Sequence, residues 1–366
     1  MNAEILVPSI ADDPRRDLAV VLNVNARGCT GRLVRRIKRS VPSANLFLSR
    51  SLLEAQEIVD TVLRRRIRLV LAGGGDGTIV DFANRIRRGI AATGAAPASG
   101  PALGILKMGT GNALAYHIGS GSPVGDLRWV RDGQPCRRTS LNLISANGRD
   151  VPFVGIGWDG AILNDYISLR ERYQDGPLRP LLTGLSGYLL ASLLVTAPRE
   201  WRLRHDPTWV SVINTGGPAH QVGAGGRIVR SFAPGETLYE GPMQIAAAST
   251  TPYYGYGFRL FPYATSLTDR FHLRLYSGGV PHALVNLRSV WNGTFASPAL
   301  TDFLVDRVHV VASRPMPFQM AGDAAGSQQQ MELSLAPDPL QLFAPERPRR
   351  RLLLPGMTIK VGKQAA

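Results

Sequence analysis

The first third of the sequence alternates short apolar runs with segments whose apolar residues recur at helical spacing. The runs occupy residues 18–25, 45–49, 67–72 and 102–106, and a helical pattern over residues 52–65 separates the second run from the third. Strands that are short, nearly all apolar and separated by helices form a parallel sheet covered on both faces. The pattern therefore predicts an α/β fold with a parallel sheet in the N-terminal part.

From about residue 140 the pattern changes to short segments of period 2 that are separated by glycine and proline, which is typical of antiparallel strands. The segments are residues 139–144, 151–157, 243–248 and 271–276. A chain of 366 residues suits two domains. We therefore predict a parallel-sheet domain over residues 1–140 and a β-rich, antiparallel, sandwich-like domain over residues 141–366, whose last strand could return to the first domain.

A helical insertion over about residues 161–196 interrupts the second half, and the longest apolar stretch, residues 180–198, lies largely within it. This stretch is shorter than a membrane span and is interrupted by small polar residues. We interpret it as a core helix. A segment that faces lipid is the alternative, because apolar helices in lipid enzymes can serve as gates for the substrate.

The composition indicates the compartment and the kind of partner. Cys29 and Cys136 are too few for a disulfide framework or a zinc site, and the first residues lack a secretory signal, so we expect a cytoplasmic protein. Lysine and arginine total 42 against 27 acidic residues, and the net charge of +15 favours an anionic partner: a nucleotide, a phospholipid surface or nucleic acid. No nucleic-acid-binding motif accompanies the charge, so we expect no nucleic acid as partner.

Two glycine-rich turns, residues 73–78 and 109–112, follow the third and fourth predicted strands. In an open parallel sheet, ligands bind beyond the carboxyl ends of the strands, where backbone amides and helix N-termini converge on an anion. Glycines let phosphate oxygens approach amides that a Cβ would shield. Asp76 lies in the first turn, and a carboxylate there is unfavourable unless it binds a metal ion or accepts a proton, as phosphoryl transfer requires.

The two turns lie in segments that resemble a known family. LAGGGDGT, followed about thirty residues later by LGILKMGTGNALA, is similar to the paired Gly-Gly-Asp-Gly-Thr and Gly-Thr-Gly-Asn motifs of the diacylglycerol kinase catalytic family. VVLNVNARG resembles the first strand and nucleotide loop of that family. VGIGWDGAILNDY and YYGYGFRLFPYATSLTDRFHLRL resemble segments of its second domain. The resemblance implies a nucleotide-binding domain, a lipid-substrate domain and an active site in the cleft between them.

The resemblance also implies roles for individual residues. Asn25 would lie beside the nucleotide, and Asp76 would either deprotonate the lipid hydroxyl or organise Mg²⁺. Asp159 and Asp165 lie near the positions that contact the lipid head group in sphingosine and ceramide kinases. The ATP phosphates would be held by Gly73, Gly74, Gly75, Gly77, Thr78, Gly109, Thr110, Gly111 and Asn112.

Three positions depart from the family pattern. Many relatives carry an acid after the asparagine of the second motif, where this chain has Ala113, and Lys107 replaces a proline before it. Bacterial diacylglycerol kinases typically carry Asp-Gly-Glu near the C-terminus, where this chain has Ala321, Gly322 and Asp323. Alanine cannot accept a proton. We therefore expect Asp76 to be the base, as in sphingosine kinases, with Asp323 as the second candidate; the metal ligands stay unassigned.

We therefore predict an ATP-dependent lipid kinase that transfers the γ-phosphate, with Mg²⁺, to a hydroxyl of diacylglycerol, a sphingoid base or ceramide. Its positive charge would hold it peripherally at the anionic inner face of the membrane. The alternatives are a soluble-substrate kinase similar to NAD kinase, which shares the Gly-Gly-Asp-Gly-Thr element, and a catalytically inactive relative that binds lipid or nucleotide. The sequence leaves the identity of the lipid and the oligomeric state open.

Overall fold

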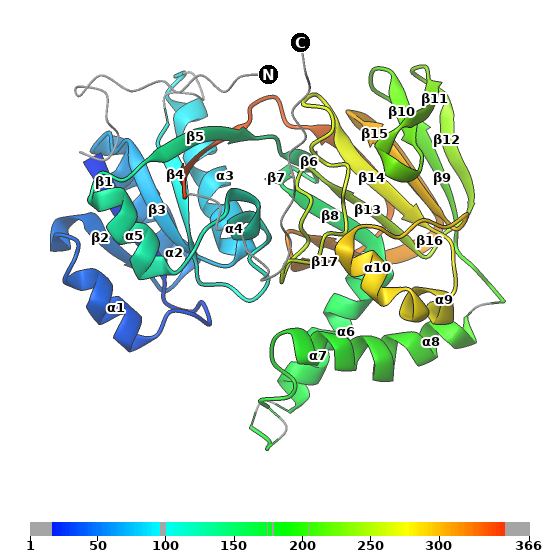
Figure 1. Cartoon of the computed structure of the whole chain (residues 1–366), viewed down its shortest axis with the longest axis horizontal. Coiled ribbons are helices and arrows are strands. Elements are labelled where there is room, and N and C mark those ends of the chain that lie inside the picture. The colour runs from blue at the N-terminus through cyan, green and yellow to red at the C-terminus, as the bar shows by residue number, and fades with distance from the viewer. Residues whose placement is uncertain (1–16, 96–99, 174, 178, 204, 348–366) are drawn as a thin grey trace, which may run out of the picture.

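The computed structural model describes residues 17–95, 100–173, 175–177, 179–203 and 205–347. The strands of these residues form two sheets, one of six strands and one of twelve. The two sheets stand side by side, and a group of helices projects from beneath the second sheet (Figure 1). The predicted order of a parallel N-terminal sheet followed by an antiparallel β-rich part is confirmed.

The first sheet has the strand order β2-β1-β3-β4-β18-β5. Its strands are β1 (Leu18–Asn23), β2 (Leu46–Ser49), β3 (Leu69–Gly74), β4 (Ala102–Lys107), β5 (Cys136–Leu141) and β18 (Leu340–Pro345). The strands β2, β1, β3, β4 and β18 run parallel, and β5 pairs with β18 in the antiparallel sense. The carboxyl ends of β1, β3 and β4 therefore meet at one edge.

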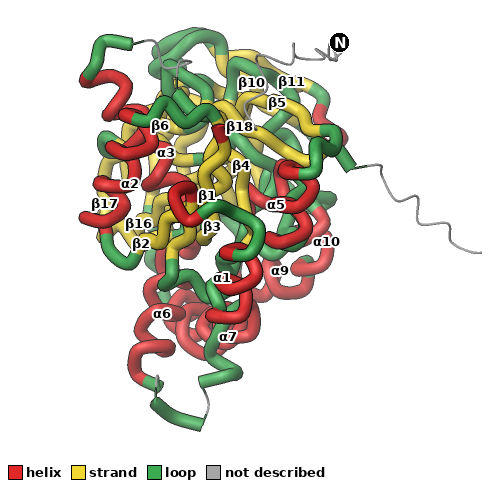
Figure 2. The backbone as a smooth tube through the Cα atoms, turned by 90° about the vertical axis from the view of Figure 1, so that its left-hand side faces the viewer, coloured by secondary structure: helices red, strands yellow, loops and turns green. Residues whose placement is uncertain are grey.

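Helices cover both faces of this sheet, as Figure 2 shows. They are α1 (Gly31–Lys38), α2 (Leu52–Arg64), α3 (Asp76–Ala92), α4 (Ala113–Ile118) and α5 (Pro123–Arg131). Alternate residues of β1 enter different cores: Ala19 and Val21 pack with α2 and α3, whereas Val20 and Leu22 pack with α1 and α5. A strand buried on both faces needs apolar residues at every position, which explains the continuous apolar runs in the sequence.

The C-terminal part of the chain contributes to the first sheet, because β18 lies between β4 and β5. Leu342 of β18 pairs with Leu103 of β4, and all six residues of β18 pair with β5. The segment 139–144, which we interpreted as a strand of the second half, is divided in the structure. Its first part belongs to β5, and the second sheet begins with β6 at Ile144.

The second sheet has the order β11-β10-β15-β14-β13-β8-β16-β17-β6-β7, with β9 paired to β16 and β12 to β9. Its strands are β6 (Ile144–Ala146), β7 (Arg149–Val151), β8 (Phe153–Gly157), β9 (Trp209–Asn214), β10 (Ala219–Val222), β11 (Ile228–Phe232), β12 (Thr237–Pro242), β13 (Ile245–Ser249), β14 (Phe271–Tyr276), β15 (Leu300–Val305), β16 (Arg307–Met320) and β17 (Asp323–Leu335). Val212 of β9 and Leu238 of β12 belong to the same apolar cluster as Phe232 and Phe303, and this cluster continues into the first sheet and its helices.

Two groups of helices lie beside the second sheet. The first group is α6 (Trp158–Arg172), α7 (Leu185–Ala191), a π-helical turn (Ser192–Thr196) and α8 (Ala197–Arg202); the second is α9 (Val280–Val285) and α10 (Leu287–Asn292). Residues 180–198 are not a core helix, so that interpretation was wrong. Ala191 packs against Leu163 and Tyr166 of α6, but Leu181 is 56 % exposed and Leu194 68 % exposed. No described helix is long and apolar enough to cross a membrane.

A buried polar network joins strands β14 and β15. Asp302 accepts hydrogen bonds from Arg274 Nε at 2.7 Å and Arg274 Nη2 at 2.9 Å, and it pairs with His272 Nε2 at 2.9 Å. Arg274 also donates to the carbonyl of Leu260. Burial lowers the pKa of His272 and keeps it neutral. Burial opposes the shift of Asp302, but the bonds from His272 and Arg274 outweigh it and lower the pKa of Asp302 to about 2.

This network predicts a stability that falls with acidification. The unfolded chain takes up a proton at His272 below about pH 6.5, which the folded state resists, so the free energy of unfolding should fall by up to about 1.4 kcal/mol per pH unit there. The free energy of unfolding should fall further below pH 3.8, the ordinary pKa of aspartate, because the unfolded chain then takes up a proton at Asp302 before the folded state does. Urea unfolding across this range should show a shallower slope between pH 6.5 and 5 for His272→Gln, which keeps a donor for Asp302. Equal slopes in the wild type and the variant would contradict the assignment.

Candidate functional site

The two glycine turns predicted from the sequence touch each other through their backbones. They follow β3 and β4, which pair in register up to Gly74 and Lys107. A Cβ on Gly109 would lie well inside the van der Waals distance of Gly75 Cα and 3.1 Å from Gly75 N. Only glycine allows this approach, because any side chain at position 109 would push the turns apart.

Asp76 fastens the first turn to the helix that follows the second. Its Oδ2 accepts the amide hydrogen of Ala113 and its Oδ1 that of Leu114, both at 2.9 Å, so that Asp76 caps the N-terminus of α4 from another part of the chain. Burial raises the pKa of Asp76, and the amide hydrogen bonds oppose this shift. Asp76 therefore has a structural task in addition to any role in chemistry.

Asn112 closes the second turn on itself. Its backbone is left-handed at φ 57°, its Oδ1 accepts from the amide of Gly109 at 2.8 Å, and its Nδ2 donates to the carbonyl of Gly109 at 2.7 Å. Both side-chain atoms are thus used within the turn. The predicted contact of Asn112 with ATP would have to come from its backbone, whereas Gly109, Thr110 and Gly111 line an open cavity.

The N-terminal loop contributes an asparagine that the sequence prediction missed. Asn23, at the end of β1, donates from Nδ2 to Thr78 Oγ1 at 2.9 Å and orients that hydroxyl beside the first turn. The predicted residue, Asn25, donates instead to the carbonyl of Arg50 at 2.8 Å. Both asparagines line the cavity. The predicted strand, residues 18–25, ended at Asn25, whereas β1 ends at Asn23, so the sequence prediction placed Asn23 inside the strand.

A cavity of about 760 Å³ lies between the two domains and unites most of the predicted site residues. Its polar end contains Asn23, Asn25, Arg27, Gly75, Asp76, Gly77, Thr78, Gly109, Thr110, Gly111, Asp159 and Asp323. Its apolar end is built by the helices of the second domain and includes Ile162, Leu163, Leu189, Leu193, Leu284, Leu287 and Trp291. Gly73 and Gly74 are buried within β3 and do not line it, because the strand continues two residues further than predicted.

Asp159 lies in a compact hydrogen-bond network at the centre of the cavity. It accepts from Tyr254 Oη and, at 2.8 Å, from Gln319 Nε2, while Gln319 Oε1 accepts from the amide of Gly322 at 2.9 Å. Burial raises the pKa of Asp159, and the bonds from Tyr254 and Gln319 oppose the shift. The network therefore holds the turn between β16 and β17, which carries Ala321 and Gly322 with φ of 52° and 85°.

This turn places Asp323 beside the first glycine turn. A Cβ on Gly77 would lie 2.8 Å from Asp323 Oδ2, so the carboxylate rests directly on Gly77. The Asp323 side chain is 57 % exposed and lies 3.9 Å from Arg149 Nη2. Partial burial raises its pKa; Arg149 lowers it and Asp81 raises it. Both Asp76 and Asp323 line the cavity, but no amide hydrogen bond from a described residue occupies the oxygen atoms of Asp323, whereas each oxygen of Asp76 accepts one.

Asp165, the other predicted substrate residue, lies apart from this site. It accepts from Thr196 Oγ1 at 2.6 Å and forms a two-pronged ion pair with Arg199 at 3.0 Å, and it does not line the cavity. These bonds tie α6 to the π-helical turn and α8. The structure thus assigns Asp165 a part in joining the helices of the second domain.

The second domain also closes over the second glycine turn. The amide of Tyr256 donates to the carbonyl of Gly111 at 2.7 Å, and a Cβ on Gly255, whose φ is 147°, would lie 3.2 Å from Gly111 Cα. Three glycine turns therefore pack one against the next: the turn at Gly75 on that at Gly109–Gly111, and the latter on the turn at Gly255. Among the described residues, no three His, Cys, Asp or Glu side chains are grouped to hold a metal ion.

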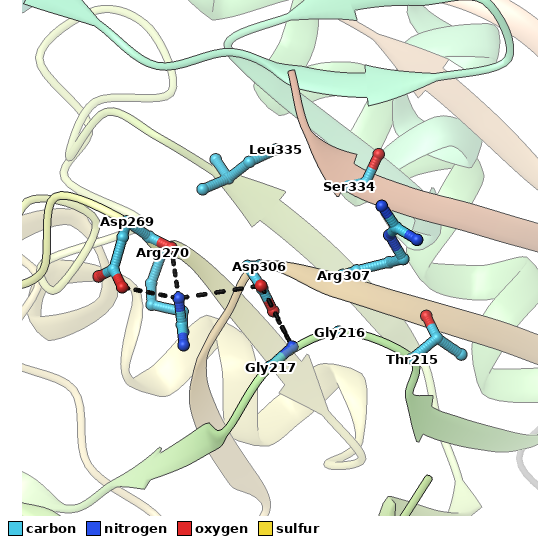
Figure 3. Close-up of a pocket in the computed structure, with 9 residues that line it drawn as sticks. All are labelled: Thr215, Gly216, Gly217, Asp269, Arg270, Asp306, Arg307, Ser334 and Leu335. Carbon is cyan, nitrogen blue, oxygen red and sulfur yellow. Dashed lines mark hydrogen bonds and ion pairs between the residues drawn. The ribbon is translucent and has the colours of Figure 1, made fainter. Parts of the chain in front are cut away.

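Figure 3 shows a second, open pocket of about 490 Å³ on the second sheet. Arg270 forms ion pairs there with Asp269 at 2.8 Å and Asp306 at 3.9 Å, and Asp306 accepts the amide hydrogen of Gly217. The charges of Asp269, Arg270 and Asp306 are paired with one another, and Arg307 also lines the pocket.

Residues 17–136 match the family model of the diacylglycerol kinase catalytic domain. These residues, less than half of the chain, are similar to a diacylglycerol kinase catalytic domain. They contain both glycine turns, and the resemblance noted in the sequence is confirmed over these residues. The match supports a kinase of this family. No curated protein matches the chain.

Solved structures from Bacillus anthracis str. Sterne resemble the chain in fold over most of its length. A diacylglycerol kinase aligns with a TM-score of 0.58 and 13 % identity, covering 90 % of this chain and 97 % of that one. A second protein, assigned only provisionally as a diacylglycerol kinase, aligns with a TM-score of 0.60 and 13 % identity, covering 90 % and 95 %. At this identity the likeness shows the fold, and it extends over both domains.

The contact between the glycine turns predicts a specific sensitivity to added methyl groups. Gly109→Ala should lower the free energy of unfolding by about 1–3 kcal/mol, because the new Cβ overlaps Gly75. Gly31→Ala is the matched control, since its Cβ would be 3.7 Å from the nearest atom, at ordinary contact. Thermal melting of both variants checks this, and a Gly109→Ala melt equal to that of Gly31→Ala would refute the close approach.

Proposed function

We propose that the protein is a lipid kinase that transfers the γ-phosphate of ATP to a lipid hydroxyl. The observation that supports this most directly is the division of the cavity between the domains. One end presents glycine turns and helix N-termini of the diacylglycerol kinase catalytic domain, and the other end is walled by apolar side chains. The polar end would bind the charged phosphate chain of ATP, and the apolar end would bind the acyl chain of a lipid.

The glycine turns would hold the triphosphate. Gly75, Gly77 and Gly111 lack Cβ atoms at the cavity wall, so phosphate oxygens can reach their amides, whereas the amide of Gly109 already donates to Asn112. Thr78, oriented by Asn23, adds a hydroxyl, and Arg27 adds a positive charge at the same end. These groups suit ATP. The net charge of +15 also favours an anionic ligand of this kind.

Asp323 is the better placed of the two acids to accept the proton of the lipid hydroxyl. In the reaction, the hydroxyl oxygen forms a bond to the γ-phosphorus, the bond from that phosphorus to the β–γ bridging oxygen breaks, ADP leaves, and the proton passes to the carboxylate. Both oxygens of Asp76 already accept amide hydrogens, whereas no amide in the described part of the chain donates to those of Asp323, which also lines the cavity. We therefore propose Asp323 as the base and Asp76 as the residue that positions the phosphate turns.

Magnesium would be bound jointly by the protein and the phosphates. Mg²⁺ typically uses one or two carboxylates together with phosphate oxygens, and it would neutralise the charge of the β- and γ-phosphates. Asp76 and Asp323 lie on either side of Gly77 and could supply those carboxylates.

A kinase for a soluble acceptor such as NAD is the second candidate. The cavity argues against it, because leucine, isoleucine and other apolar side chains make up most of the wall from the second domain, although Arg170, Ser192 and Glu200 also line it, and a nucleotide acceptor needs mainly polar partners. Peripheral action at the inner face of the membrane, from the cytoplasm, belongs to the same proposal.

A phosphotransfer assay with labelled ATP tests the choice of acceptor. Diacylglycerol, sphingosine and ceramide, each in detergent micelles, are offered beside NAD. We expect label in one lipid class and none in NAD. Phosphorylation of NAD alone would replace the proposal with the soluble kinase, and ATP binding without transfer to any acceptor would indicate an inactive relative.

The assignment of the base predicts different behaviour of two variants. Asp323→Asn should lower kcat by about 10²–10⁴-fold while leaving the melting temperature almost unchanged, since its side chain is exposed and weakly paired. Asp76→Asn should lower both, because the amide group of asparagine cannot accept hydrogen bonds at two atoms, at a cost of about 1–3 kcal/mol.

Asp338→Asn provides the matched control for these two variants. Asp338 lies 4.0 Å from Arg87 Nη2, is 42 % exposed and does not line the cavity. Its replacement should change neither rate nor stability. A fully active Asp323→Asn enzyme would exclude Asp323 as the base and return that role to Asp76.

A further inference from the structure

We propose that an exposed apolar rim around the mouth of the cavity docks on the surface of an anionic lipid bilayer. The inference rests on the proposed lipid acceptor and identifies the surface that would deliver it. The rim consists of Leu189, Leu193, Leu194, Leu284, Val285 and Leu287, which belong to α7, the π-helical turn, α9 and α10.

The rim is continuous with the apolar end of the cavity. Leu189, Leu193, Leu284 and Leu287 line the cavity, yet each is also counted among the large exposed apolar residues. An apolar surface thus runs from the interior to the outside without a polar barrier at these positions. A lipid that entered along it would stay in contact with apolar side chains.

The two most exposed residues of the rim do not line the cavity. Leu194 is 68 % exposed and Val285 is 85 % exposed, and neither lines the cavity. Each follows directly in sequence a residue that does, Leu193 or Leu284. Clusters of exposed apolar side chains mark contact sites, and transfer of one such side chain out of water contributes about 1.5–3 kcal/mol.

Two distant parts of the chain come together to form the rim. The insertion α6–α8 projects from the lower side of the second sheet, and α9–α10 lie against the sheet on that same side (Figure 1). Helices α8 and α9 are in contact. A flat bilayer could therefore meet both sides of the rim at once.

The charges on these helices fit an anionic surface. Within the helices α6–α10, Arg170, Arg172, Arg202 and Arg288 are exposed, and Glu171 is the one exposed acid among their described residues. The loops beside these helices add exposed Arg179, Asp175 and Asp206, so the basic residues remain in excess. Each basic residue near an anionic membrane contributes about 1 kcal/mol. A second copy of the chain on the rim would repeat these positive charges and cover the mouth of the cavity. A bilayer neutralises the charges and supplies the substrate through the mouth.

Vesicle co-sedimentation tests the proposal with the variant Leu194→Glu/Val285→Glu. The vesicles are phosphatidylcholine alone or phosphatidylcholine mixed with phosphatidylglycerol. We expect the wild type to bind the anionic vesicles and the variant to bind them at least about tenfold more weakly. Because neither residue lines the cavity, phosphorylation of a short-chain acceptor in detergent should be unchanged, while phosphorylation of the same lipid class in vesicles falls.

Ile228→Glu/Val229→Glu is the matched control, because both residues are exposed apolar residues of β11, at 51 % and 62 %. Strand β11 lies at the opposite end of the second sheet from α7, α8 and α9 (Figure 1). It should bind vesicles as the wild type does. Wild-type protein that fails to bind anionic vesicles, or a rim variant that binds them equally well, would overturn the docking surface. Light scattering provides a further test. A wild-type protein that is a dimer, and a rim variant that is a monomer, would show that the rim binds a second copy of the chain and would also overturn the docking surface.

The two proposals can fail separately. Vesicle binding that depends on the rim, without transfer of phosphate to any lipid, would sustain the docking surface and refute the lipid kinase. If the rim variant still phosphorylates lipid and still binds vesicles as the wild type does, the lipid kinase would be supported and the docking surface refuted.

Discussion

The backbone contact between Gly75 and Gly109 is the constraint on which the site depends. It brings the ends of β3 and β4 together so closely that no side chain fits between the turns. Asp76 then ties the first turn to the amides of Ala113 and Leu114, and Asn112 closes the second turn. The result is a wall of backbone amides whose position is set by main-chain packing and by a buried carboxylate, and therefore resists displacement.

The second domain completes this wall. Its loop at Gly255 and Tyr256 packs on Gly111, and the turn between β16 and β17 lays Asp323 against Gly77. The network of Asp159, Tyr254 and Gln319 holds that turn, while β18 returns to the first sheet. Residues separated by more than two hundred positions thus share one cavity. The site forms only when the whole chain is folded.

The cavity separates two kinds of surface by the elements that build them. Strand ends and glycine turns provide polar atoms, because backbone amides at helix N-termini have no partner within the helix. Helices packed by one face provide the apolar end, and their opposite faces remain exposed. The same helices therefore contribute both an apolar lining and an apolar exterior, which is the physical basis for linking the acceptor site to a lipid surface.

Local patterns in the sequence were sufficient for the parallel sheet, the glycine turns and the resemblance to the diacylglycerol kinase catalytic family. Strands buried on both faces require continuous apolar runs, and turns that approach phosphate require glycine, so both leave traces at adjacent positions. Tertiary structure alone decided the rest. Asn23 donates a hydrogen bond to Thr78, and Asp165 pairs with Arg199. Asp76 caps α4, and Asp323 contacts Gly77. Residues 180–198 are partly exposed. Each of these depends on contacts between residues far apart in the chain, and hydrophobic periodicity within one segment carries no information about which partner will cover it.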